Sequence, residues 1–143
     1  MNNHPLFLYP PNEYESEKAS NSYLMSVIAV MIGLPLPVIN LIATAIFFLA
    51  NRRASHFVRW HCMQALLSQG FTFPINVAGV YWTLSILFGA NIISNSYIAY
   101  IITIVIFNAV EFIATVYAAV QTRKGNHVEW WLFGPLTNLL IKA

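Results

Sequence analysis

The amino-acid sequence predicts an all-α integral membrane protein. It has three transmembrane helices, the first and second kinked by proline, and a C-terminal interfacial amphipathic helix. The composition is the first reason, because 58% of the 143 residues are hydrophobic and only 8% are charged, against about 25% charged in soluble domains. The second is that no charged residue lies between Lys18 and Arg52, or between Arg59 and Glu111. A spanning helix needs about 20 apolar residues, so the first interval fits one span and the second fits two with a turn.

The N-terminal residues read as a separate segment. Residues 1–22 are polar, and Pro5, Pro10 and Pro11 disfavour a stable helix there. We therefore expect a flexible polar tail over residues 1–22, followed by a single helical membrane domain over residues 23–143.

The first two spans each contain proline. The first is expected over about residues 23–50, where Pro35 and Pro37 remove helix hydrogen bonds and should kink it. The second is expected over about residues 56–88, with a kink at Pro74.

The third span is expected over about residues 97–121, after an uncharged turn. The last apolar stretch is shorter than the roughly 20 residues a span requires, and Trp130 and Trp131 favour the headgroup region. We expect an interfacial helix over about residues 127–142. A short fourth span is the alternative that the sequence leaves open.

The distribution of positive charge predicts the orientation, because loops rich in Lys and Arg stay in the cytoplasm. In the three-span arrangement both basic clusters fall on one side of the membrane. This predicts a multi-pass protein of the cytoplasmic (inner) membrane, with its N-terminus outside and its C-terminus in the cytoplasm. The clusters are Arg52, Arg53 and Arg59 in the first loop, and Arg123, Lys124 and Lys142 near the end.

Polar side chains follow one face of each predicted span. Such side chains are costly in hydrocarbon and usually face protein or water, so the three faces should converge. Counting 1.5 Å per residue inward from the basic end of each span places one group of these polar side chains at a similar depth in the membrane. The predicted membrane-buried polar cluster consists of Asn40, Gln69, Thr72, Asn76, Asn108 and Glu111.

Glu111 is the one ionisable residue expected deep in the membrane. A structural interpretation is that its carboxyl group hydrogen-bonds a neighbouring helix and holds the bundle together. A functional interpretation is a site for a proton, a cation or a passing substrate segment. The sequence leaves both open.

No catalytic, cofactor-binding or metal-binding arrangement is recognisable. The chain has no hydrolase, zinc-protease or phosphate-loop motif, and His56 and His61 would point in different directions on a helix. The net charge of +2 does not favour nucleic-acid binding. We therefore expect no enzyme activity, no cofactor and no metal.

The segment 55–69 opens the second span with Phe57, Arg59, His61, Gln64 and Ala65. This motif resembles the family of the twenty-kilodalton subunit of the chloroplast inner-envelope import translocon and its small uncharacterised bacterial membrane relatives. The resemblance extends over about residues 23–143. It implies a helical membrane fold and, more weakly, a role in protein transport.

These observations predict a non-enzymatic multi-pass inner-membrane subunit that binds membrane proteins or translocating polypeptide segments. Its expected partners are the lipid bilayer and either a membrane protein or further copies of itself, and not nucleic acid. The alternative is a small oligomeric channel or carrier in which Glu111 is a buried proton or cation site.

Overall fold

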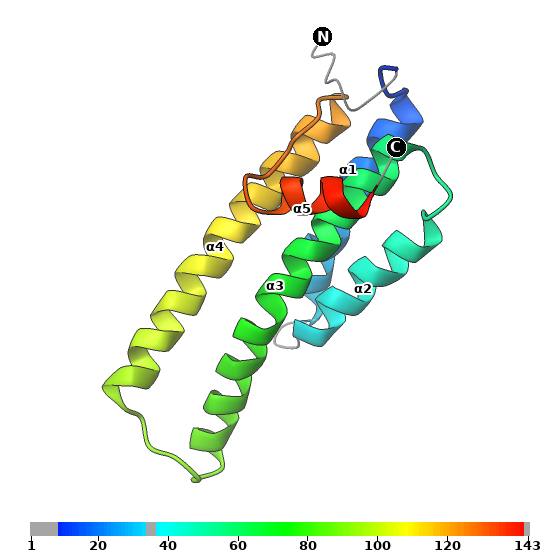
Figure 1. Ribbon diagram of the computed structural model, residues 1–143. Helices are drawn as coiled ribbons and strands as arrows, with labels where there is room; N and C mark the ends of the chain where they lie inside the picture. Colours follow the sequence, from blue (N-terminus) through cyan, green and yellow to red (C-terminus); the bar gives the residue numbers. More distant parts are fainter. Residues whose placement is uncertain (1–8, 34–36, 142–143) are drawn as a thin grey trace.

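The computed structural model describes residues 9–33 and 37–141, which fold into five helices with no β-strand among them (Figure 1). The all-helical class predicted from the sequence is therefore confirmed. The helices are α1 (Glu13–Gly33), α2 (Pro37–Ala50), α3 (His56–Leu87), α4 (Asn95–Arg123) and α5 (Phe133–Leu140).

Helices α3 and α4 form one long antiparallel hairpin. They contain 32 and 29 residues, or roughly 48 and 44 Å at 1.5 Å per residue. The connection uses Gly89 at a φ of 73°, a left-handed conformation that glycine adopts at little cost. Ser94 then caps α4 by accepting a hydrogen bond from the Tyr97 N–H at 3.2 Å. Both helices begin and end within two residues of the bounds predicted for the second and third spans.

The apolar surface of this hairpin points outward. In the most apolar 18-residue window of each helix, only 11% of α3 and 6% of α4 is buried. Ile102, Val105 and Ile106 are 53%, 61% and 60% exposed. The core helix of a soluble protein would bury most of such a stretch, so hydrocarbon is the solvent that suits these helices.

Two of the described helices, α3 and α4, are long and apolar enough to cross a membrane. Helix α2 is apolar but has only 14 residues. The prediction of three transmembrane helices is therefore not confirmed.

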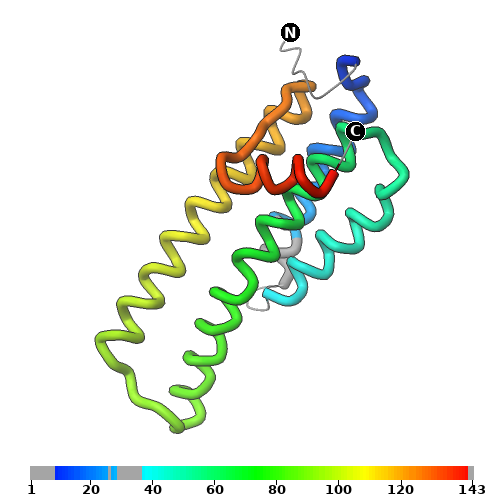
Figure 2. Tube along the Cα trace, in the orientation of Figure 1, coloured from blue at the N-terminus to red at the C-terminus, as the bar shows by residue number. Residues whose placement is uncertain are grey.

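The first predicted span, residues 23–50, is not one kinked helix. Helix α1 ends at Gly33 and α2 begins at Pro37, where proline suits the first turn because it needs no N–H partner there. Helix α2 then runs back along α1 and α3 (Figures 1 and 2). Helices α1 and α2 thus run in opposite directions and form a hairpin of their own, and the predicted kink at Pro35 lies outside the described residues.

Helix α1 begins ten residues before the expected start. Asn12 and Glu15 form a capping box: the Asn12 side chain accepts the Glu15 N–H at 2.8 Å, and the Glu15 carboxylate accepts the Asn12 N–H at 2.9 Å. The Tyr9 hydroxyl donates to the same carboxylate at 3.0 Å. These bonds satisfy N–H groups at the helix start, so residues 13–22 are helical and not the flexible tail expected from the sequence.

The start of α1 and the end of α4 lie at the same end of the bundle (Figure 1). The Glu17 carboxylate is 3.6 Å from the Arg123 guanidinium. The expectation of an N-terminus and a C-terminus on opposite sides of the membrane assumed one crossing between Tyr23 and Ala50, where the structure has a helical hairpin.

The C-terminal segment also differs from the expected interfacial helix over residues 127–142. Only Phe133–Leu140 are helical, and this short helix packs across α3 (Figure 1). The Phe133 ring lies 5.8 Å from that of Phe71, and the Trp60 indole donates to the Asn138 side chain at 2.6 Å. Contacts with α3 thus position this segment against the bundle.

The core lies where α1 packs against α3 and α4, and small side chains dominate it. Ala19, Ala118 and Ala119 are buried there together with Ala65. The Ser20 hydroxyl donates to the Ala119 carbonyl at 2.8 Å. Small residues let membrane helices approach closely, and interhelical hydrogen bonds such as this one hold them together.

Candidate functional site

A polar stripe runs along α3, with different partners on its two halves. The half near the start of α3 holds α1 and the C-terminal segment, whereas the following half holds α4. The stripe consists of His61, Gln64, Ser68, Gln69, Thr72 and Asn76, of which all but Asn76 are buried.

Gln64 is the centre of the first half and has no exposed surface. Its amide nitrogen donates to the Tyr23 hydroxyl at 2.8 Å and to the Val128 carbonyl at 3.0 Å. Its carbonyl oxygen accepts the Trp130 N–H at 3.0 Å. One side chain therefore fastens both α1 and the C-terminal segment to α3.

His61 lies one turn before Gln64 and is fully buried among aromatic rings. Its Nδ1 is 2.8 Å from the Tyr23 hydroxyl, and its Nε2 is 3.3 Å from His127 Nδ1. His127 Nε2 is in turn 3.9 Å from the Glu129 carboxylate. In the part of the chain that the structure describes, no group of three or more His, Cys, Asp or Glu side chains could hold a metal ion.

Glu111 joins α4 to the second half of the stripe. Its Oε1 accepts hydrogen bonds from the Gln69 amide at 2.8 Å, the Ser68 hydroxyl at 3.0 Å and, on its own helix, the Thr115 hydroxyl at 3.2 Å. Three neutral donors thus converge on one carboxylate oxygen, which matches the structural interpretation of Glu111 as a link between helices.

Two turns further along the hairpin, Asn76 and Asn108 pair reciprocally. The Asn76 amide donates to Asn108 at 3.0 Å, and the Asn108 amide donates to Asn76 at 2.7 Å. Asn108 also donates to the Ile104 carbonyl at 2.8 Å. This pair satisfies two amides inside an otherwise apolar hairpin.

The predicted polar cluster is only partly assembled. Gln69, Asn76, Asn108 and Glu111 pair across α3 and α4, as described above. Thr72 is buried beside them, and its hydroxyl donates to the Gln69 carbonyl at 3.1 Å.

Asn40 does not join this cluster. It lies on α2, which packs against α1 and α3 and not against α4. Its side-chain oxygen is buried without a hydrogen-bond partner among the described residues. The expected convergence of three polar faces thus fails for α2, because the chain reversal before it places α2 on the far side of α3.

The motif residues that open α3 serve packing. Phe57 lies in the core beside Ala19, with its ring 4.6 Å from that of His61. Ala65 packs against Tyr23 in the second core cluster. Arg59 is half-buried near the basic end.

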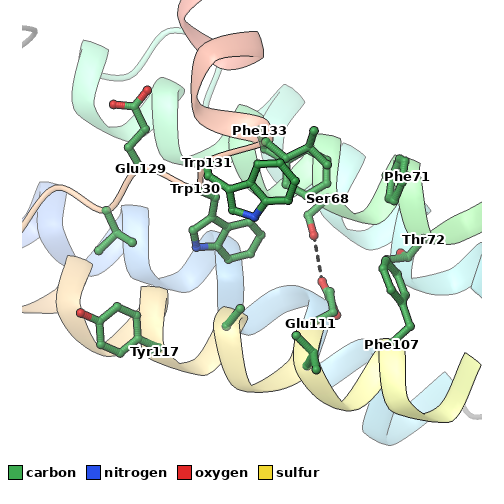
Figure 3. Close-up of a pocket in the computed structure, with 14 residues that line it drawn as sticks. Ser68, Phe71, Thr72, Phe107, Glu111, Tyr117, Glu129, Trp130, Trp131 and Phe133 are labelled. Carbon is green, nitrogen blue, oxygen red and sulfur yellow. Dashed lines mark hydrogen bonds between the residues drawn. The ribbon is translucent and has the colours of Figure 1, made fainter. Parts of the chain in front are cut away.

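A pocket of about 580 Å³ lies between α3, α4 and the segment that precedes α5 (Figure 3). Ser68 and Glu111 face each other, with the rings of Trp130, Trp131 and Phe133 over them and those of Phe71 and Phe107 to one side, beside Thr72. The sequence prediction did not include this pocket. The aromatic residues Trp130, Trp131 and Phe133 were visible as a short apolar stretch, but their approach to α3 depends on Gln64.

The magnetosome magnetite crystal formation protein family (MamF/MmsF) has a family model that matches residues 19–137. The chain belongs to this family. The match includes α2, α3, α4 and most of α1. No curated protein and no solved structure matches the chain.

Membership of the magnetosome family corrects the resemblance drawn from residues 55–69. The assignment to the import-translocon family and its bacterial relatives is wrong. The motif was short, and its residues fill a core and anchor neighbouring segments, which is a packing requirement that unrelated membrane proteins can share. The family and the two outward-facing apolar helices together identify a membrane protein.

Proposed function

We propose that this chain is a non-enzymatic multi-pass membrane protein that contributes to magnetite crystal formation by binding other membrane proteins. The observation that carries the proposal is the family match over residues 19–137. The geometry supports the non-enzymatic part, because the buried polar groups of α3 are engaged in holding helices together.

The membrane topology that we propose has two crossings, by α3 and α4. Tyr23 is level with His61, since their side chains are 2.8 Å apart. Ten residues later α1 ends at Gly33, roughly level with Phe71, whereas α3 continues for about another 24 Å to Leu87. The α1–α2 hairpin therefore enters the membrane only part of the way, as a re-entrant element packed against protein.

The orientation follows from the basic residues. Arg52, Arg53, Arg123 and Lys124 are all at the end of the bundle where α1 begins, whereas the turn between α3 and α4 carries no charge. Positive loops stay in the cytoplasm, so both ends of the described chain face it. Because the family's name gives the magnetosome, we propose the membrane of the magnetosome as the location. Fractionation of cells distinguishes it from the inner membrane.

An indirect role in crystal formation is supported by the placement of the acidic side chains. The chain has no Asp, and its five Glu residues are Glu13, Glu15, Glu17, Glu111 and Glu129. Glu111 is held inside the bundle, and the uncharged turn on the other side of the membrane offers no carboxylate, the ligand that hard cations prefer. We therefore place the action on partner proteins and not on the mineral.

The proposed partner surface is the half of the α3–α4 hairpin that α1, α2 and α5 leave bare. A photo-crosslinking residue at Ile102 of α4, 53% exposed, should capture a defined membrane protein in magnetite-forming cells. The same residue at Ile46 of α2, 61% exposed, is the matched control. Capture of lipid alone at Ile102 would contradict partner binding.

A deletion tests the role in crystal formation. Removing the chain from a magnetite-forming cell should change the size or shape of the crystals, and the wild-type chain should restore them. Unchanged crystals would contradict the proposal.

The alternative of a channel or carrier has its own test. Liposomes containing the wild-type chain or Glu111→Gln should give the same proton or cation flux as empty liposomes. A flux that depends on Glu111 would favour the channel instead.

A further inference from the structure

The pocket beside Glu111 has the construction of a binding site for an amphiphile. Its volume of about 580 Å³ falls within the roughly 300–1,000 Å³ of small-molecule sites, which combine an apolar lining with a few polar groups. Phe71 and Phe107 come from α3 and α4, and Trp130 and Phe133 come from the C-terminal segment (Figure 3). Ser68, Thr72 and Glu111 lie together at one end, whereas the Glu129 side chain, which also lines the pocket, lies apart from them (Figure 3).

At that end, the protons of the two hydroxyl groups are already engaged in hydrogen bonds, whereas some of the oxygen acceptors are not. The Ser68 hydroxyl donates to Glu111 Oε1, and the Thr72 hydroxyl donates to the Gln69 carbonyl. Each hydroxyl has one proton and retains a lone pair. Glu111 Oε1 already accepts three hydrogen bonds, so the second carboxylate oxygen is the one with capacity for a ligand.

The same end selects the polar group of the ligand. A charged Glu111 presents Oε2 as an acceptor and requires a donor, whereas a neutral Glu111 carries its proton on Oε2 and requires an acceptor. A hydroxyl group satisfies both states, since it donates and accepts. A plain hydrocarbon chain satisfies neither and leaves the polar end of the pocket without a partner.

The entrance lies toward lipid. Tyr117 and Trp131 line the pocket and are 58% and 87% exposed. Tyrosine and tryptophan are the side chains that suit the membrane interface. A ligand dissolved in the bilayer can therefore reach Glu111 without crossing water.

We propose that this pocket binds a membrane-dissolved phenol, such as the head of a quinol, with its hydroxyl on Glu111, its ring among the aromatic side chains and its tail in the bilayer. Aromatic pairs add attraction beyond simple burial, and this favours a phenol over an aliphatic alcohol. The proposal concerns binding and is independent of the role in crystal formation.

The test measures binding of tritiated 4-nonylphenol to the chain in lipid nanodiscs, with empty nanodiscs subtracted. The competitor is nonylbenzene, which has the same ring and tail but no hydroxyl group. Binding should saturate, and nonylbenzene should compete at least about fivefold more weakly, as expected for loss of a hydrogen bond worth about 1 kcal/mol. Equal competition by nonylbenzene, or binding that does not saturate, would overturn the proposal.

Two variants locate the site. Ala114 lines the pocket and Ala109 is exposed on the same helix, so Ala114→Trp should abolish binding and Ala109→Trp should retain it. Equal binding by the two tryptophan variants would refute the site.

Discussion

Replacing Gln64 should release the C-terminal segment from α3. Gln64→Met keeps the length of the side chain but removes three hydrogen bonds, to Tyr23, Val128 and Trp130. Two of these bonds, to Val128 and Trp130, hold the C-terminal segment, and each contributes about 1 kcal/mol. The docked state should therefore lose about 2 kcal/mol. Since 1.4 kcal/mol corresponds to a factor of ten, the opening equilibrium should shift roughly thirtyfold.

Hydrogen exchange in detergent micelles measures this directly. Protection of the backbone amides of residues 127–140 should fall about thirtyfold in Gln64→Met, while the centre of α4 keeps its protection. Gln121→Met is the matched control, because Gln121 makes an exposed side-chain bond to Asn126 and its loss should leave the segment docked. Equal protection in both variants would refute the assignment of Gln64 as the anchor.

Three further predictions concern other contacts. In mixed micelles, Asn76→Leu should lower the free energy of unfolding by about 0.6–2 kcal/mol. The double variant Asn76→Leu/Asn108→Leu should lower it by less, because it leaves no unpaired amide. Additive losses from the two single variants would contradict the pairing. Asn12→Ala should destabilise the start of α1 by about 1 kcal/mol, which should appear as faster amide hydrogen exchange over residues 13–17. Unchanged exchange there would contradict the capping box. Burial raises the pKa of Glu15, but hydrogen bonds from Asn12, Ser55 and Tyr9 outweigh it and lower the pKa overall. Because the pKa of Glu15 is lower in the folded state, its carboxylate stabilises the fold at pH values above its unfolded-state pKa of about 4.3, and this stabilisation is lost as the pH falls. The stability advantage of the wild-type chain over Glu15→Gln should therefore vanish in acid. A difference that stays constant with pH would contradict this.

The long hairpin was predictable because its signal is local. The uncharged interval between Arg59 and Glu111 contains two apolar stretches separated by polar turn residues, and each stretch became one helix. The capping box of Asn12 and Glu15 was equally local. Pro10 and Pro11 precede the cap and therefore do not oppose the helix that follows it.

The reversal between α1 and α2 was not predictable in the same way. Proline removes a helix hydrogen bond whether the chain bends slightly or turns back, so Pro35 and Pro37 do not distinguish a kink from a hairpin. The position of Asn40 and the side of the membrane assigned to the N-terminus both depended on that choice. Asn40 therefore lies apart from the cluster in which it was predicted.

The candidate site was predictable where it lies on one face of α3 and α4. Gln69, Asn76, Asn108 and Glu111 share depths that helix geometry fixes, and the structure pairs them. The pocket depends on contacts between Gln64 and the distant Val128 and Trp130. No spacing within either segment reveals such a contact.

Cysteine labelling in sealed vesicles tests the central claim, that α3 and α4 cross the membrane while both ends of the described chain stay on one side. The lone Cys62 is buried and is replaced in a Cys62→Ala background, into which Glu13→Cys, Asn91→Cys or Asn126→Cys is introduced singly. An impermeant maleimide should reach positions 13 and 126 from the same side and position 91 only from the other. Labelling of positions 13 and 126 from opposite sides, or of all three from one side, would contradict the two-crossing topology.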